Sequence, residues 1–174
     1  HSGRFALGNK LKDMGYDLDK AALEKAYQRF LEIADKKKDV SERDLETIVA
    51  EEVYMVAEDY KIEKIEIKSG THQTSQAKVV LNHKGRKVLK MATGAGPVDA
   101  VYQAIAFLTK VKAKLLDYSI QAITGGTDAL GEVTVRLEGK NKIFVGHGAD
   151  TDIIVASAKA YLTAINRLLY STRG

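Results

Sequence analysis

Two short glycine-containing stretches are the places in this sequence where backbone groups could bind an anion. The stretch TGAGPVDAV contains Gly94 and Gly96, and the stretch GHGADTDII contains Gly146 and Gly148. Each comes after a strand-like run and before a helix-like run. The free N–H groups at a helix N-terminus attract phosphates and carboxylates, so a glycine pair in this position raises the question of a nucleotide site.

The residues around both glycine pairs disfavour a nucleotide. Asp99 and Thr151 stand where a Gly-x-Gly-x-x-Gly fingerprint has its third glycine, and no Gly-Lys-Ser/Thr follows either pair. Two interpretations remain. The glycines allow turns or close strand-to-helix packing. Alternatively, they form a backbone nest for a small zwitterion, whose carboxylate meets helix N-terminal N–H groups and whose ammonium meets Asp99, Asp128 or Asp150.

Signals for catalysis or for a metal centre within the chain are weak. The histidines are scattered, without the spacing of a zinc site. They are His1, His72, His83 and His147. Cysteine is absent, which excludes thiolate ligands and disulfides and fits a cytoplasmic protein. We therefore expect no metal and no cofactor in this chain.

The composition predicts a folded chain without a nucleic-acid or membrane partner. Hydrophobic residues make up 45% of the sequence, enough for a packed core, and the net charge is only +4. Lysines alternate with acidic residues along strand-like runs instead of clustering, so a solvated surface is favoured over a nucleic-acid-binding face. No apolar run approaches the roughly 18 residues of a membrane span. The chain begins HSGRF, without an initiator Met, so we expect it to be part of a longer protein.

Residues 1–58 are predicted to form a small helical linker. Apolar residues after Asp19 recur at three- and four-residue steps, which places them on one helix face. They are Leu23, Ala26, Tyr27, Phe30, Leu31 and Ala34. Asp19 and Ser41 are typical N-cap residues, and Gly15 is a typical stop for a short preceding helix.

Residues 59–174 are predicted to form a second domain built from a repeated unit. YKIEKIEIKS, TSQAKVVLNH and RKVLKMAT read as three strands, with a turn at Lys84-Gly85, and a helix follows over about 96–112. LLDYSIQAI, LGEVTVRLEG and NKIFVGHG then repeat the three strands before a helix that ends the chain. The units, about 59–112 and 113–174, each have the order β-β-β-α. This order predicts an α+β, pseudo-twofold domain with helices packed on largely antiparallel sheets.

Several stretches, taken in order and spacing, resemble the C-terminal half of the 2-isopropylmalate synthases. They are HSGR, ADKKKDVSERDLETIV, GAGPVDAVYQAI, LLDYSIQAITGGTDALGEVTVRLE and GHGADTDIIVASAKAYLTAINRL. The related citramalate synthases fit nearly as well. The resemblance implies a helical linker followed by a regulatory domain, which binds the end-product amino acid at a homodimer interface. That effector is leucine in the first family and isoleucine in the second.

The resemblance also implies a catalytic domain that precedes the HSGR segment and is absent from this chain. In such enzymes a TIM barrel with a divalent metal (Zn, Mg or Mn) joins acetyl-CoA to a 2-oxo acid, which is 2-oxoisovalerate for the isopropylmalate enzyme. The fragment alone is then expected to be inactive. His1 matches a family histidine that contributes to the active site only in the intact enzyme. An unregulated dimerisation module remains an alternative.

The resemblance implies an effector site assembled from four segments. These are a helix start with Val98 and Asp99, a strand with Leu115, Tyr118 and Ala122, a loop with Asp128 and Ala129, and the second glycine stretch with Ile153 and Ile154. Small apolar side chains suit a branched aliphatic ligand. One methylene in such a pocket changes the binding free energy by only about 1–3 kcal/mol, so the sequence leaves leucine and isoleucine both open.

Overall fold

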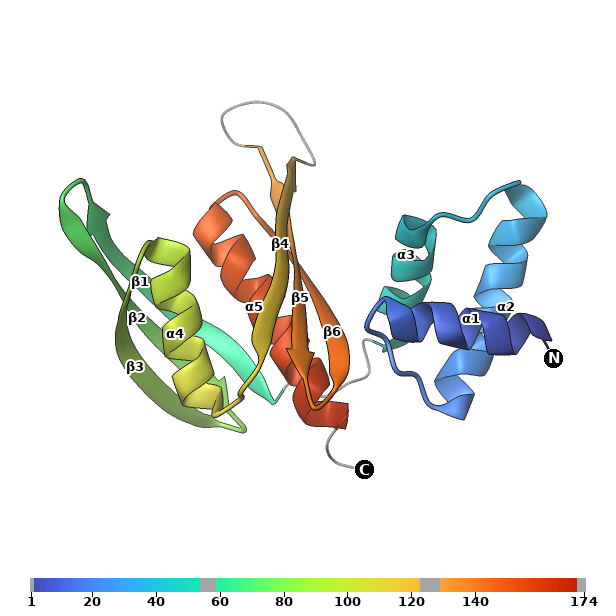
Figure 1. The fold of residues 1–174 in the computed structure, drawn as a ribbon, viewed down its shortest axis with the longest axis horizontal. Coiled ribbons are helices and arrows are strands. Elements are labelled where there is room, and N and C mark those ends of the chain that lie inside the picture. The colour runs from blue at the N-terminus through green and yellow to red at the C-terminus, as the bar shows by residue number, and fades with distance from the viewer. Residues whose placement is uncertain (1, 54–58, 123–128, 172–174) are drawn as a thin grey trace. The chain divides into compact units, whose positions relative to one another are not determined.

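A computed structural model of the 174-residue chain describes residues 2–53, 59–122 and 129–171. The chain divides into two compact units, His1–Ala57 and Glu58–Gly174 (Figure 1). The described part of the first is helical, and the second combines sheets with helices, which confirms the predicted α+β class. Within the described residues, no helix is both long enough and apolar enough to cross a membrane.

The described part of the first unit contains three helices, α1 (Ser2–Asp13), α2 (Lys20–Lys36) and α3 (Glu42–Val53). Two begin beside the predicted caps. The Asp19 carboxylate accepts a hydrogen bond from the N–H of Ala22 at 2.8 Å, and the Ser41 hydroxyl accepts one from the N–H of Asp44 at 3.1 Å. These oxygens satisfy N–H groups that a first helical turn leaves without a partner, which fixes where each helix starts.

The second unit contains two antiparallel three-stranded sheets. The first has the order β1 (Tyr60–Gly70), β2 (Gln73–His83), β3 (Arg86–Gly94). The second has the order β4 (Lys114–Ala122), β5 (Gly131–Gly139), β6 (Lys142–Asp150). Each sheet is followed by a helix, α4 (Pro97–Thr109) or α5 (Ile153–Ser171), so the repeated order of three strands and a helix is confirmed. Lys84 and Gly85 both adopt positive φ in the predicted hairpin turn.

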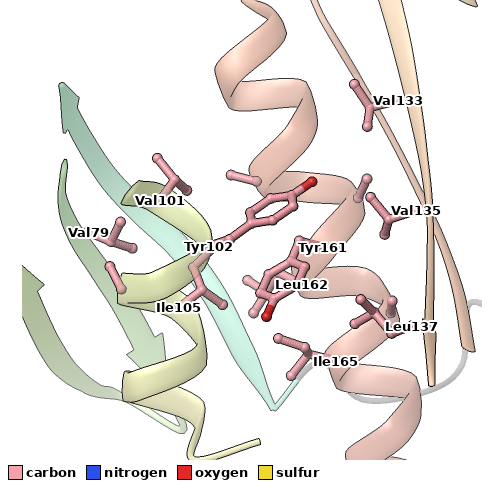
Figure 2. Packing of buried hydrophobic residues seen from close by; sticks show 14 of the residues in the cluster. Val79, Val101, Tyr102, Ile105, Val133, Val135, Leu137, Tyr161, Leu162 and Ile165 are labelled. Carbon is pink, nitrogen blue, oxygen red and sulfur yellow. The ribbon is translucent and has the colours of Figure 1, made fainter. Parts of the chain in front are cut away.

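The core of the second unit lies between its two sheets. The central strands bury every second residue, the period of a strand with one face toward a core. The buried side chains are Ala77, Val79 and Leu81 of β2 and Val133, Val135 and Leu137 of β5. Helix α4 packs on β2 and β3, α5 packs on β5 and β6, and the two helices pack on each other (Figure 2). The two repeats therefore share one core.

Two tyrosines join the helices at the centre of this core. The ring of Tyr102 on α4 stacks on the ring of Tyr161 on α5, with centroids 4.1 Å apart and planes 12° apart (Figure 2). Both residues are buried, and burial raises the pKa of both phenols. Both hydroxyls therefore stay neutral, and the stack adds to the area that the two aromatic rings bury.

An asparagine on α5 holds the start of β1. The side-chain amide of Asn166 donates to the carbonyl of Tyr60 at 3.0 Å, and its oxygen accepts from the N–H of Tyr60 at 3.1 Å. The Tyr60 ring also stacks on His83, with centroids 4.1 Å apart. Asn166 thus takes the place of a neighbouring strand at the point where the chain enters the second unit.

Replacing Asn166 by leucine, which has the same branched shape but no polar atoms, should destabilise the second unit. The change leaves both backbone polar groups of Tyr60 without this partner, and we expect about 2 kcal/mol to be lost from the free energy of unfolding in urea. Thr163→Val on the same helix is the control, because the Thr163 hydroxyl bonds only to the carbonyl of Lys159 one turn earlier. Equal stability of the Asn166 and Thr163 variants would contradict the anchoring role of Asn166.

Candidate functional site

The two glycines of the first pair, Gly94 and Gly96, have different roles. Gly94 is the last residue of β3, and Gly96 is the N-cap residue of α4 with an extended backbone, φ −155°. A Cβ atom added to Gly94 would collide with the backbone of Ala100, with its Cα at 2.8 Å, whereas one added to Gly96 would meet nothing within 4 Å. Gly94 therefore permits the close approach of α4 to β3, and the approach to the helix start beside Gly96 stays open.

The second glycine pair lies elsewhere than predicted. The sequence suggests a loop at Gly146 and Gly148, but both are inside β6. A Cβ atom would stand 2.7 Å from the backbone N of Ala164 in the first case and 2.6 Å from that of Ala160 in the second, and each would also overlap a helix carbonyl. The interpretation as a loop or nest is wrong, and the alternative interpretation, close strand-to-helix packing, is confirmed, because α5 crosses β6 so closely that only a hydrogen atom fits between them. These glycines serve strand-to-helix packing.

Two of the three carboxylates predicted to meet an ammonium group, Asp99 and Asp150, already bind their own neighbours. The Asp99 carboxylate accepts the N–H of Ala95 at 2.8 Å, so it closes the first turn of α4. The Asp150 carboxylate accepts the N–H of Asp152 at 2.9 Å and pairs with the ammonium of Lys159 at 3.0 Å. The backbone hydrogen bond, assisted by Lys159, lowers the pKa of Asp150. Both side chains shape the loops before the helices.

The strand-borne candidates lie on β4, an edge strand of the second sheet. The register pairs Tyr118 with Val135 and Ile120 with Val133, and because both valines face the core, so do their partners. Leu115 is 42% exposed and Ile120 is 54% exposed, although both belong to this face. Ile120 was absent from the predicted site. The alternation of a strand would have indicated it, because it stands two residues after Tyr118.

Three of the candidates lie along β4 and the start of α5. Ala122 pairs with Gly131, and a Cβ atom on Gly131 would stand 2.8 Å from the Cδ1 of Ile153. One turn further along α5, the Ser157 hydroxyl lies 2.6 Å from the hydroxyl of Tyr118. Tyr118, Ala122 and Ile153 therefore belong to one neighbourhood between β4 and the first turns of α5.

Two further candidates, Val98 and Leu115, lie next to the neighbourhood of Tyr118, Ala122 and Ile153. Val98 is linked to this neighbourhood through Tyr102, one turn along α4, whose ring meets that of Tyr118 edge-on with centroids 6.4 Å apart. Leu115 stands near the other end of β4 from Ala122. Leu115 is on the same strand face as Tyr118 and three positions from it, so it borders Tyr118 on the side away from Ala122.

The remaining candidates are placed less centrally. Ile154 lies in the first turn of α5, where its N–H donates to the Asp152 carboxylate at 2.8 Å. Ala129 is half-buried just before β5. His1 and Asp128 fall outside the described residues.

The chemistry available on the inner face of β4 is that of binding. The face offers aliphatic side chains and one phenol, Tyr118. Among the residues that the structure describes, no group of three His, Cys, Asp or Glu side chains is placed to hold a metal ion. An exposed apolar face of this kind suits an apolar ligand or a second protein surface.

Comparison with known proteins gives consistent matches. A sequence model of the LeuA allosteric (dimerisation) domain family matches residues 39–169. The 2-isopropylmalate synthase of Gloeothece citriformis is 45% identical over 168 residues, which are 96% of this chain and 31% of that protein. The 2-isopropylmalate synthase of Gloeobacter violaceus is 44% identical over 172 residues, 98% of this chain and 32% of that protein. The chain thus spans about a third of the length of the curated relatives it matches.

The contrast between the glycines can be tested with two alanine substitutions. Gly148→Ala should lower the free energy of unfolding by about 3 kcal/mol, because its methyl group overlaps backbone atoms of α5 that cannot move alone. Gly96→Ala, at a position with free space, should cost less than about 1 kcal/mol. Urea titrations of both variants measure the difference. A small effect at Gly148 would contradict the close crossing of α5 and β6.

Proposed function

This chain belongs to the LeuA allosteric (dimerisation) domain family, and on that premise we propose that it is the leucine-binding regulatory domain of a 2-isopropylmalate synthase. The observation that carries the proposal is the inner face of β4. Leu115 and Ile120 are exposed there beside the half-buried Tyr118, although this face of the sheet otherwise turns toward the core. Apolar side chains that are exposed next to one another on a face which otherwise packs against the core are typical of a surface that binds a ligand or a partner.

The partner we propose for this face is a second copy of the chain. The family is described by its dimerisation, and a homodimer would bring two copies of the β4 face together. Each copy would bury aliphatic side chains such as Ile120. Burial of apolar surface is the main favourable term in association.

The effector we propose is leucine. The relatives named above are 2-isopropylmalate synthases, which favours leucine over isoleucine as the end product sensed. An aliphatic ligand side chain would lie against Ile120, Ala122 and Ile153. The ammonium and carboxylate groups of leucine would be held by the Tyr118 hydroxyl and by backbone N–H groups at the helix starts.

Binding of this kind would regulate a distant active site by linkage. Leucine would stabilise one state of the intact synthase and so inhibit the condensation of acetyl-CoA with 2-oxoisovalerate. A coupling free energy of about 1–3 kcal/mol is typical of such effects. If both copies contribute to the site, leucine also stabilises the dimer, since a ligand favours the state that binds it.

The dimer can be tested at β4. Ile120→Asp should raise the dissociation constant of the dimer by about tenfold or more, because a carboxylate would be buried without a partner. Ser119→Asp is the control, since the neighbouring residue points to the opposite face of the same strand, across from Thr134. Sedimentation at several protein concentrations measures both variants. Equal dissociation of the two would exclude the inner face of β4 as the interface.

The effector can be tested by calorimetric titration of the full chain. Leucine should bind, and isoleucine should bind more weakly. Leucine should also inhibit the intact synthase, and Ala122→Phe should reduce both binding and inhibition by filling the space beside Ile153 that the ligand would occupy. A chain that dimerises but binds neither amino acid would instead be a dimerisation module.

A further inference from the structure

Ser157 on α5 is the point where three elements of the second unit meet. The residue is fully buried. Its hydroxyl lies 2.6 Å from the hydroxyl of Tyr118 on β4 and 2.7 Å from the carbonyl of Ile153 on its own helix. Its carbonyl accepts the hydroxyl of Tyr102 on α4 at 3.2 Å. The side chain of Ser157 thus connects a residue of the candidate site to α5, and its backbone carbonyl connects α5 to α4.

The direction of the bond between Tyr118 and Ser157 follows from a count of protons. A serine hydroxyl has one proton to donate, and a backbone carbonyl can only accept. The Ser157 proton is used on the carbonyl of Ile153. We therefore assign Tyr118 as the donor to the Ser157 oxygen, because only this arrangement gives both short contacts of the Ser157 hydroxyl a proton. The phenol oxygen of Tyr118 then has no proton left to offer and retains lone pairs, so toward any further group it acts as an acceptor.

The Tyr118 ring has little freedom to change this arrangement. Its hydroxyl is held by Ser157, and its ring meets Tyr102 edge-on, with centroids 6.4 Å apart and planes 67° apart. Tyr102 is in turn fixed by its stack on Tyr161 (Figure 2). Turning the Tyr118 proton toward a ligand would break its hydrogen bond to Ser157. Because Ser157 is buried, water cannot replace the lost bond, so the change costs free energy.

From this geometry we propose that Ser157 is a positioning residue that makes Tyr118 a hydrogen-bond acceptor for the effector, so that the site selects an amino acid over the corresponding 2-oxo acid. The inference rests on the proposed function, in which Tyr118 faces the effector. An ammonium group supplies donors to the phenol oxygen. A 2-oxo group supplies only acceptors, so two oxygens would face each other without a proton between them.

The inference is tested by titrating the full chain with leucine and with 4-methyl-2-oxopentanoate, the 2-oxo acid of the same carbon skeleton. The wild-type chain should prefer leucine. Ser157→Ala should weaken leucine binding by about tenfold, the usual loss for a hydrogen bond to a charged group, and leave the binding of the 2-oxo acid unchanged or stronger. A loss of packing alone would weaken both ligands equally, and that result would overturn the proposal.

Tyr118→Phe provides a second variant with an intact ring. It should weaken leucine binding by a similar factor, and adding Ser157→Ala to it should cause no further loss, because the two residues act through one bond. The controls are Tyr161→Phe, a buried tyrosine beyond this bond, and Thr109→Val, a buried hydroxyl that likewise bonds the carbonyl four residues earlier. Both controls should bind leucine as the wild type does.

The failures of the two proposals are distinguishable. A wild-type chain that binds no leucine overturns the proposed function and this inference together. Leucine binding that is unchanged in Ser157→Ala overturns the inference alone. NMR tests the bond without any ligand: the hydroxyl proton of Tyr118 should show a nuclear Overhauser effect to the β-protons of Ser157. A proton placed away from Ser157 would overturn the inference.

Discussion

The packing of α4 against α5 is the contact on which the rest of the second unit depends. A three-stranded sheet with an apolar face must bury that face against another layer. Here each helix covers its own sheet and the other helix at the same time, and Tyr102 stacks on Tyr161 where they meet. The two repeats can therefore fold around one core.

The same packing distinguishes the two repeats at their first strands. In the first repeat, the apolar side chains of β1 are partly buried against the core, as Ile62 and Ile65 show. In the second repeat, the equivalent strand β4 keeps Leu115 and Ile120 exposed. Two sequences with one order of elements thus yield one covered strand and one uncovered strand. The uncovered strand is the surface that supports the proposed dimer and effector site.

The hydrogen bonding of Tyr118 in the candidate site depends on the core beneath it. Tyr118 lies at the boundary, with its ring against Tyr102 and its hydroxyl on the buried Ser157. Exchange of the buried Ser157 would therefore alter the hydrogen bonding of Tyr118. A binding surface built in this way is positioned by residues that no ligand contacts, which is a common requirement for a precise site.

The sequence by itself determined the elements of this protein. Strand alternation, helix periodicity and local signals such as Asp19, Ser41 and the Lys84-Gly85 turn depend on residues a few positions apart, so they can be read without the fold. The resemblance to the 2-isopropylmalate synthases also named Tyr118 for the candidate site, which stays a prediction. The sequence could not decide whether Gly146 and Gly148 form a loop or a strand, because that depends on how closely α5 crosses β6. Nor could it link Tyr118 to Ser157, since 39 residues separate them and only the packing of β4 on α5 brings their hydroxyls together.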